Sequence, residues 1–174
     1  SRQWMQQAGG QRGIIVSLGC GDGGQTCLDL HADGRYVVQA LDRDQQRVAA
    51  ARRLVQSEEV CGPVSVRRLD GDRLPFLDNL INLVVVEDSL GIDEQEIMRV
   101  VRPLGAAMIR DGDTYRRVEK PWPDDLDPWT HFLHSASGNA VSQDGRVGPP
   151  RRLCWSADTR SEERRVGKEC IVKC

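Results

Sequence analysis

The 174-residue sequence lacks several features that would each place it in a defined class of protein. It has no long apolar run, because LINLVVV (Leu80–Val86) is far too short to span a membrane. It has no excess of positive charge, since the formal net charge is −2, and this disfavours a nucleic-acid partner. It has no signal peptide, although it starts at Ser1 rather than Met, so we interpret it as a fragment and leave its compartment open.

The six cysteines lack the spacing of a metal site or of a disulfide framework. No two form a C-x-x-C pair, and Cys20, Cys27 and Cys61 fall in apolar or tight-turn contexts that are typical of small buried residues. His131 and His134 form an H-x-x-H pair without an evident third ligand, which favours packing in a loop-rich segment. We therefore predict neither disulfides nor a metal site.

The first part of the chain alternates between apolar strands and amphipathic helices. Asp44 is the expected N-cap of the second helix, and Pro103 is expected to stop the third. The expected strands are residues 13–18, 35–42, 64–69, 81–88 and 105–112, and the expected helices are residues 24–33, 45–59 and 93–103. This alternation predicts an α/β fold with a doubly wound, mostly parallel sheet of about five strands in the order 3-2-1-4-5.

The alternating pattern ends near Gly112, and we predict three segments from it. Residues 1–112 form the sheet domain. Residues 113–156, rich in proline, acids and tryptophan, form a linker and a loop-rich lead-in with short β pieces. Residues 157–174 are charge-dense and resemble a foreign sequence, RSEERRVGKEC, that recurs at the ends of unrelated metagenomic reading frames. We expect this tail to be disordered and not native.

The stretch IIVSLGCGDGGQT (Ile14–Thr26) combines a strand, a glycine turn and a helix start. Such a unit predicts a nucleotide-like ligand lying across the turn. The glycine spacing fits both the dinucleotide pattern G-x-G-x-x-G and the shorter G-x-G-x-G of S-adenosylmethionine enzymes. Asp22 lies inside the turn, where it would repel a pyrophosphate but tolerate a sulfonium and an ammonium group.

Two further carboxylates follow the next two expected strands. Asp42 ends the second strand, where a carboxylate can accept both ribose hydroxyls of either kind of ligand. Asp70 stands just past the third strand, where it could accept a hydrogen bond from an adenine amino group. Together these positions favour an adenosyl ligand lying across three successive strand ends.

Four segments together resemble the class I S-adenosylmethionine-dependent methyltransferases: VSLGCGDG, VVQALDRD, LDGDRLPFLDNLINLVVV and EIMRVVRPLGAAMI. The resemblance covers Gly13 to Gly112 and preserves the order of the motifs. It implies a Rossmann-like fold, S-adenosyl-L-methionine as cofactor and methyl transfer to an acceptor that the sequence does not identify. The residues it places at the cofactor are Gly19, Gly21 and Gly23 at the methionine part, Asp42 at the ribose, and Asp70 with Gly71 at the adenine.

The sequence also departs from this family. Ser17 is also a candidate cofactor-binding residue, but it offers a hydroxyl and no charge where the family commonly has an acid oriented toward the ligand ammonium. Asn82 stands where the family has aspartate. The last two strands of the family have no expected counterpart. No catalytic residue is assigned, because Glu87 and Asp88 at the end of the fourth strand are interpreted as a solvated loop. The alternative is therefore a catalytically inactive scaffold or ligand-binding module, while an NAD-dependent oxidoreductase is disfavoured by Asp22.

The stretch from Pro121 to Trp155 has a resemblance of its own. It is similar to the lead-in to a PQQ-like β-propeller in large proteins of planctomycete-type bacteria, which join such a propeller to a methyltransferase-like module. The matching positions are Trp129, His131, Gly138, Asn139, Asp144, Val147–Arg151 and Trp155. The resemblance implies an intramolecular propeller as partner, although no blade repeat follows in this sequence.

Overall fold

In a computed structural model, structure is described for residues 12–32, 34–126, 136, 138 and 145. The chain divides into two compact units, residues 1–123 and 124–174. Every helix and strand among the described residues lies in the first unit. None of the described helices is long and apolar enough to cross a membrane.

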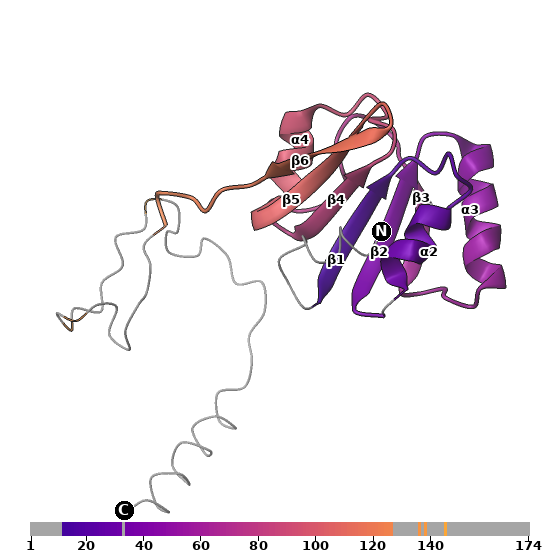
Figure 1. Ribbon diagram of the computed structural model, residues 1–174, viewed down its shortest axis with the longest axis horizontal. Helices are drawn as coiled ribbons and strands as arrows, with labels where there is room; N and C mark the ends of the chain where they lie inside the picture. The colour runs from indigo at the N-terminus through magenta and orange to yellow at the C-terminus, as the bar shows by residue number, and fades with distance from the viewer. Residues whose placement is uncertain (1–11, 33, 127–135, 137, 139–144, 146–174) are drawn as a thin grey trace, which may run out of the picture. The chain divides into compact units, whose positions relative to one another are not determined.

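The first unit is built on one six-stranded sheet with the order β3-β2-β1-β4-β5-β6 (Figure 1). The first five strands are parallel and β6 is antiparallel to β5. The predicted Rossmann-like fold and the order 3-2-1-4-5 are therefore confirmed. The strands are β1 (Gly13–Leu18), β2 (Tyr36–Asp42), β3 (Val64–Arg68), β4 (Ile81–Val86), β5 (Val101–Asp111) and β6 (Thr114–Glu119).

The sixth strand is the main difference from the fold expected from the sequence. The chain turns back at Gly112, whose φ of +60° suits glycine, and β6 then pairs with β5 along its whole length. In TYRRVE only Tyr115 and Val118 are half-buried, so the strand shows no alternation that the sequence could reveal. The expected five strands are one too few, and the sheet continues past Gly112, where the sequence pattern predicts its end.

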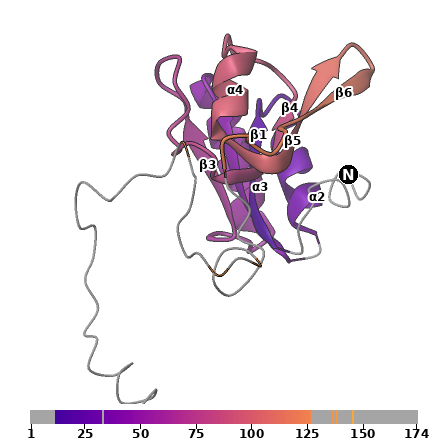
Figure 2. The same cartoon turned by 90° about the vertical axis from the view of Figure 1, so that its left-hand side faces the viewer.

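Helices cover both faces of the sheet. α2 (Gln25–His31) and α3 (Gln45–Ser57) pack on one face, and α4 (Glu94–Val100) packs on the other (Figure 2). Alternate residues of each strand supply the two core layers, as expected for a sheet buried on both sides. The first layer includes Ile15, Val38, Leu83 and Val85 with Leu30, Val48 and Val55 of the helices, and the second includes Val16, Leu41, Val84 and Val86 with Ile97 and Val100.

The ends of the helices follow local chemistry. Asp44 is the N-cap of α3, as predicted, and its side chain accepts hydrogen bonds from the backbone N–H groups of Gln46 and Arg47. α4 ends at Val100, three positions before Pro103, because the chain enters β5 at once. Pro103 instead lies where the β4–β5 register is irregular, between the pairs that Val101 and Ala106 form.

Arg99 of α4 anchors the long loop between β3 and β4. Its guanidinium pairs with Glu96 at 2.7 Å and with Asp78, and it donates to the carbonyl oxygens of Leu74 and Phe76 at 3.2 and 3.0 Å. The hydrogen bond from Arg99, with a second one from the Leu74 backbone N–H at 2.7 Å, holds the pKa of Glu96 below its ordinary value. The ionised Glu96 carboxylate therefore stabilises the folded state above about pH 4.5, and this contribution is lost as the pH falls through its lowered pKa.

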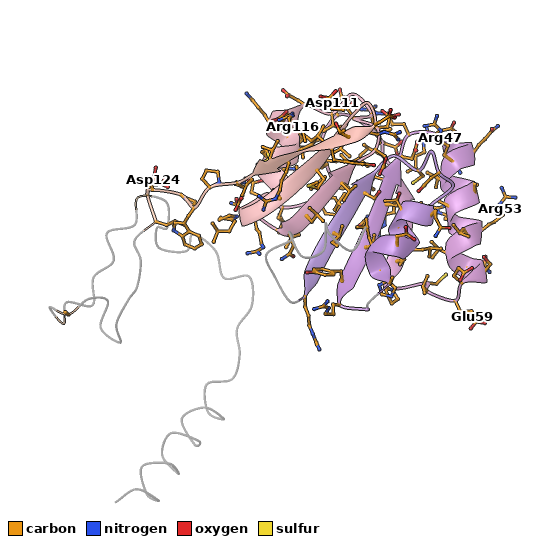
Figure 3. The ribbon with its side chains drawn as sticks, viewed as in Figure 1. Arg47, Arg53, Glu59, Asp111, Arg116 and Asp124 are labelled. Carbon is orange, nitrogen blue, oxygen red and sulfur yellow. The ribbon has the colours of Figure 1, made fainter. Side chains whose placement is uncertain are left out.

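Replacing Arg99 by leucine is expected to lower the free energy of unfolding by about 2–3 kcal/mol, because two carbonyl groups and two carboxylates lose their donor. Urea denaturation at neutral pH measures the loss. Arg53→Leu is the matched control. Arg53 is an exposed arginine of α3 that donates to the Ala49 carbonyl oxygen of its own helix, and its loss should cost less than about 0.5 kcal/mol (Figure 3). Equal losses in both variants would contradict an anchoring role for Arg99.

Candidate functional site

The candidate site lies at the carboxyl ends of the parallel strands, where the strand order reverses between β1 and β4. Ligands of doubly wound sheets bind at such a switch point. The glycine loop, residues 19–24, leaves β1 here and enters α2. The backbone N–H groups of Glu87 and Asp88 both donate to Leu18 O, at 2.9 and 3.2 Å, so the end of β4 lies directly against the start of the loop.

The four glycines of this loop serve different purposes. A Cβ on Gly19 would lie 3.0 Å from Asp88 Cβ, and one on Gly24 would lie 2.9 Å from Ala51 Cβ, so both are required by packing inside the protein. Gly23 has a φ of +73°, which an L side chain rarely adopts. Gly21 does not have a positive φ, and a Cβ at this position would meet no atom of the described residues within 4 Å, its two chain neighbours aside. Space is therefore open at Gly21.

The Asp22 carboxylate accepts hydrogen bonds from the backbone N–H groups at the start of α2. It accepts from Gly24 N at 2.9 Å and from Thr26 N at 2.6 Å. Burial acts to raise the pKa of Asp22, but the hydrogen bonds from Thr26 and Gly24 outweigh it and leave the pKa below its ordinary value. The amides on which a dinucleotide would place its pyrophosphate are thus already bonded to a carboxylate of the chain itself.

Asp42 fastens the glycine loop to the end of β2. Its side chain is only 1% exposed, and its two oxygens accept from Cys20 N at 2.7 Å and Asp44 N at 2.8 Å. Gly19 N also donates to Leu41 O at 2.9 Å. The carboxylate therefore lies beside the loop, and its hydrogen-bond donors are backbone amides, while its contact with a ribose stays a prediction.

Arg47 brings a positive charge to the same edge. Its guanidinium lies 3.9 Å from Asp42, 3.9 Å from Asp44 and 3.8 Å from Asp88. The side chain is 47% exposed, and Figure 3 shows it at the edge toward which the β1 and β2 arrows point. Arg47 thus balances carboxylates that come from β2, α3 and the end of β4.

Asp70 and Gly71 follow β3, two strands away from the glycine loop. The Asp70 side chain is 81% exposed and pairs with Arg68 at 3.3 Å, and Gly71 has a φ of +80° with open space at its Cα. Arg43, just after β2, links this loop to the next one by pairing with Asp72 at 2.8 Å and donating to Leu90 O at 2.7 Å. The loops after β2, β3 and β4 are therefore joined.

Ser17 is buried, as Asp42 is, whereas Gly21, Asp70 and Gly71 are exposed. Ser17 has no exposed surface, lies beside the Cys27 thiol, and its Oγ makes no hydrogen bond of normal geometry among the described residues. Burial raises the pKa of Cys27 to about 12, while the Ser17 hydroxyl acts to lower it, and burial likewise raises that of Cys20 to about 12. The thiols of Cys20 and Cys27 are therefore protonated near neutral pH. Both cysteines are buried, as predicted, whereas Cys61, which was also expected to be buried, is exposed.

Glu87 is the group that sequence interpretation missed. The sequence favours a solvated loop at this position, yet the side chain of Glu87 is only 15% exposed. Tyr115 of β6 donates to its Oε1 at 2.5 Å, and Arg110 of β5 donates to its Oε2 at 3.3 Å. Burial, followed by the bond to Glu87, raises the pKa of Tyr115 to about 12, so the phenol keeps its proton at neutral pH.

The site thus offers a glycine loop with open space at Gly21 and carboxylates after β2, β3 and β4. The guanidinium groups of Arg43 and Arg47 lie beside these carboxylates. This arrangement can bind a ligand that carries cationic and hydroxyl groups, and it disfavours a phosphate at α2. In residues 12–32 and 34–126, no three His, Cys, Asp or Glu side chains gather as metal ligands would.

Comparison with known proteins gives a family match over most of the sheet unit. Residues 15–111, more than half of the chain, match the family described as methyltransferase domain. No curated protein matches the chain. The match begins in β1 and ends with β5, so it contains the glycine loop, Asp42, Asp70 and Glu87.

Solved structures share the fold at low sequence identity. A candidate S-adenosyl-L-methionine-dependent methyltransferase from Methanococcus maripaludis is 19% identical, with a TM-score of 0.51, and the match covers 62% of this chain and 52% of that one. Geranyl diphosphate C-methyltransferase from Streptomyces coelicolor, solved with Mg²⁺, geranyl diphosphate and S-adenosyl-L-homocysteine, is 17% identical, with a TM-score of 0.54 and coverages of 62% and 43%.

A third neighbour has another activity. The cyclase SpnF is 23% identical, with a TM-score of 0.54 and coverages of 62% and 42%. These likenesses concern the fold, which does not by itself fix a reaction. The match spans about half or less of the length of each of these three proteins.

Proposed function

Because the chain belongs to the methyltransferase domain family, we propose that its sheet unit binds S-adenosyl-L-methionine and transfers the methyl group to an acceptor molecule. The fold neighbours from Methanococcus maripaludis and Streptomyces coelicolor, whose names include this activity, support the proposal. The overall charge of −2 favours a small-molecule acceptor over nucleic acid.

The observation that carries the proposal is the open space at Gly21. Nothing in the described protein requires glycine there, whereas Gly19 and Gly24 are required by packing. A side chain at Gly21 would project into this open space, and in doubly wound sheets a ligand approaches the backbone of this loop closely. Asp22 adds discrimination, because it already bonds the amides that a pyrophosphate would need.

The residues proposed to hold the cofactor are those that the resemblance to the family indicates. Gly19, Gly21 and Gly23 contact the methionine part through their backbone. Asp42 accepts hydrogen bonds from the ribose hydroxyls with the lone pairs that the Cys20 and Asp44 amides do not use. The side chain of Arg47, 3.9 Å from Asp42, moves aside when the ribose binds. Asp70, with its exposed carboxylate, and Gly71 contact the adenine. Ser17 stays beneath the loop as part of its packing.

The bound cofactor would supply a methyl group already activated by attachment to a sulfonium. The protein then has to bind, orient and exclude water, and it needs a base only where the acceptor must lose a proton. The backbone of the glycine loop and the joined loops after β2, β3 and β4 can provide this orientation. Such a site does not need a catalytic triad, and none is assigned.

Calorimetry is expected to show that the chain binds S-adenosylmethionine or S-adenosylhomocysteine in preference to NAD. The physical reason is that Asp22 repels a pyrophosphate and already occupies its donors. Asp22→Asn serves as a control, because it removes the negative charge while keeping one acceptor oxygen, and it should weaken the discrimination against NAD. Binding of NAD by the unaltered chain, without binding of either adenosyl ligand, would overturn the assignment.

We also propose that the segment after the sheet unit leads into a PQQ-like β-propeller of a longer protein. The similarity of Pro121–Trp155 to such a junction supports this partner. Of the matching positions only Gly138 is described, and the others lie outside the described residues. The expected disordered tail, residues 157–174, also lies outside them.

A further inference from the structure

We propose that Glu87 and Arg110 together bind the amino-acid end of the cofactor, with Tyr115 as the positioning residue of Glu87. This inference rests on the proposed function, since that end carries one ammonium and one carboxylate group. It moves recognition of the ammonium away from position 17, where the resemblance to the family places it, to the end of β4.

The first argument is the position of Glu87 against the glycine loop. Its backbone N–H donates to Leu18 O at 2.9 Å, and a Cβ on Gly19 would lie 3.4 Å from its own Cβ. The residue therefore extends from the point where the loop leaves β1. Tyr115, which donates to Glu87, packs against the core layer that contains Cys27 and Leu30 of α2, so the cluster lies on the α2 side of the sheet.

The second argument is that position 17 cannot serve this purpose. Ser17 carries no charge, is completely buried and lies beside Cys27 in the layer beneath α2. Glu87 is a carboxylate on the neighbouring strand end, and it keeps 15% of its side chain exposed, while Asp88 beside it pairs with Arg47. A strand end next to β1 can thus supply the negative charge that β1 itself lacks.

The third argument is charge complementarity. The Glu87 carboxylate and the Arg110 guanidinium lie 3.3 Å apart, and Arg110 is 50% exposed. A carboxylate beside a guanidinium matches an ammonium beside a carboxylate, so each ligand group can meet an opposite charge. Arg110 Nε also donates to Gly112 O at 3.0 Å, which holds the guanidinium against the β5–β6 turn and limits the entropy lost on binding.

Tyr115 holds Oε1 of Glu87 by a hydrogen bond and is itself uncharged. Its phenol, with a pKa raised to about 12, remains a donor at neutral pH and cannot take the proton of a ligand ammonium. Tyr115 comes from β6, so the strand that the sequence did not reveal completes the subsite.

The test compares two ligands that differ in the amino-acid end. S-adenosylhomocysteine carries it, and 5′-methylthioadenosine lacks it. Glu87→Gln is expected to weaken binding of S-adenosylhomocysteine at least about 10-fold and to change binding of 5′-methylthioadenosine less than about 2-fold. Arg110→Met should show the same selectivity, and Tyr115→Phe a smaller loss with the same selectivity. Calorimetry on the full chain, with circular dichroism to verify folding, measures each case.

The matched control is Glu94→Gln. Glu94 of α4 forms an exposed ion pair, 2.6 Å long, with Arg116, which lies on the same β5–β6 hairpin as Arg110 and Tyr115 (Figure 3). This variant should leave the affinity for both ligands unchanged. Equal loss of both ligands in Glu87→Gln and Arg110→Met, or no loss in either variant, would overturn the subsite while the proposed function stands. Failure of the unaltered chain to bind either ligand would overturn the proposed function and, with it, the subsite.

Discussion

Replacing Gly21 by valine is expected to weaken binding of S-adenosylhomocysteine at least about 100-fold while changing the free energy of unfolding by less than about 1 kcal/mol. The physical reason is that the added atoms enter space that is free of non-neighbouring atoms of the described residues within 4 Å of Cβ, and that a ligand must use to reach the loop backbone. The backbone at Gly21 does not have a positive φ, so valine introduces little strain. Calorimetry and urea denaturation measure the two quantities separately.

Gly24→Ala is the opposite control for this experiment. Its Cβ would lie 2.9 Å from Ala51 Cβ and its φ is +101°, so the variant should lose about 2–3 kcal/mol of stability. The affinity of its folded fraction should fall much less than that of Gly21→Val. If Gly21→Val binds the ligand normally, the open space at Gly21 is not the ligand cradle, and the observation on which the proposed function rests is lost.

Replacing Asp42 by alanine is expected to lower the free energy of unfolding by about 3–5 kcal/mol. The carboxylate is 1% exposed and accepts one backbone N–H with each oxygen, and hydrogen bonds to a charged group contribute about 1.5–3 kcal/mol each. Its removal leaves the buried Cys20 N–H without this acceptor. Urea denaturation measures the loss, and hydrogen exchange at Cys20 and Asp44 should localise it to the glycine loop and the turn after β2.

Asp44→Ala is the matched control, because this exposed N-cap accepts from two amides of α3 and should contribute only about 1 kcal/mol. Asp42→Asn keeps one acceptor oxygen but turns an amide NH₂ toward a backbone donor, so it should recover little of the loss. A cost for Asp42→Ala no larger than that for Asp44→Ala would mean that the carboxylate does not hold the loop.

Much of the architecture follows from local patterns in the chain. The apolar runs at residues 13–18, 64–69 and 81–88, separated by helical spacing, predict parallel strands covered on both faces. Right-handed crossovers then leave few possible orders, and the order 3-2-1-4-5 is the one observed. Asp44 is identifiable as an N-cap because capping depends on residues two or three positions apart.

One departure from the family pattern, Asn82, acquires a reason only in three dimensions. Asn82 accepts a hydrogen bond from Ile14 N at 2.9 Å, so its amide holds the start of β1. Gly105 is required because a Cβ would lie 2.8 Å from Asn82 O, while Leu104 adopts a φ of +60° beside it. Ile14 and Gly105 both lie far from Asn82 in the sequence, and no periodicity connects the three positions.

The sequence by itself determined the parallel order of five strands, the position of Asp42 at the end of the second strand and the capping of α3, because these depend on side-chain period, crossover handedness and contacts between near neighbours. Only the tertiary structure decided the addition of β6, the burial of Ser17 and the pairing of Glu87 with Tyr115 and Arg110. The physical reason is that a polar strand such as TYRRVE gains its stability from the edge it pairs with. Likewise, a carboxylate acquires its neighbours from strands 23 and 28 residues further along the chain, which the fold alone brings together.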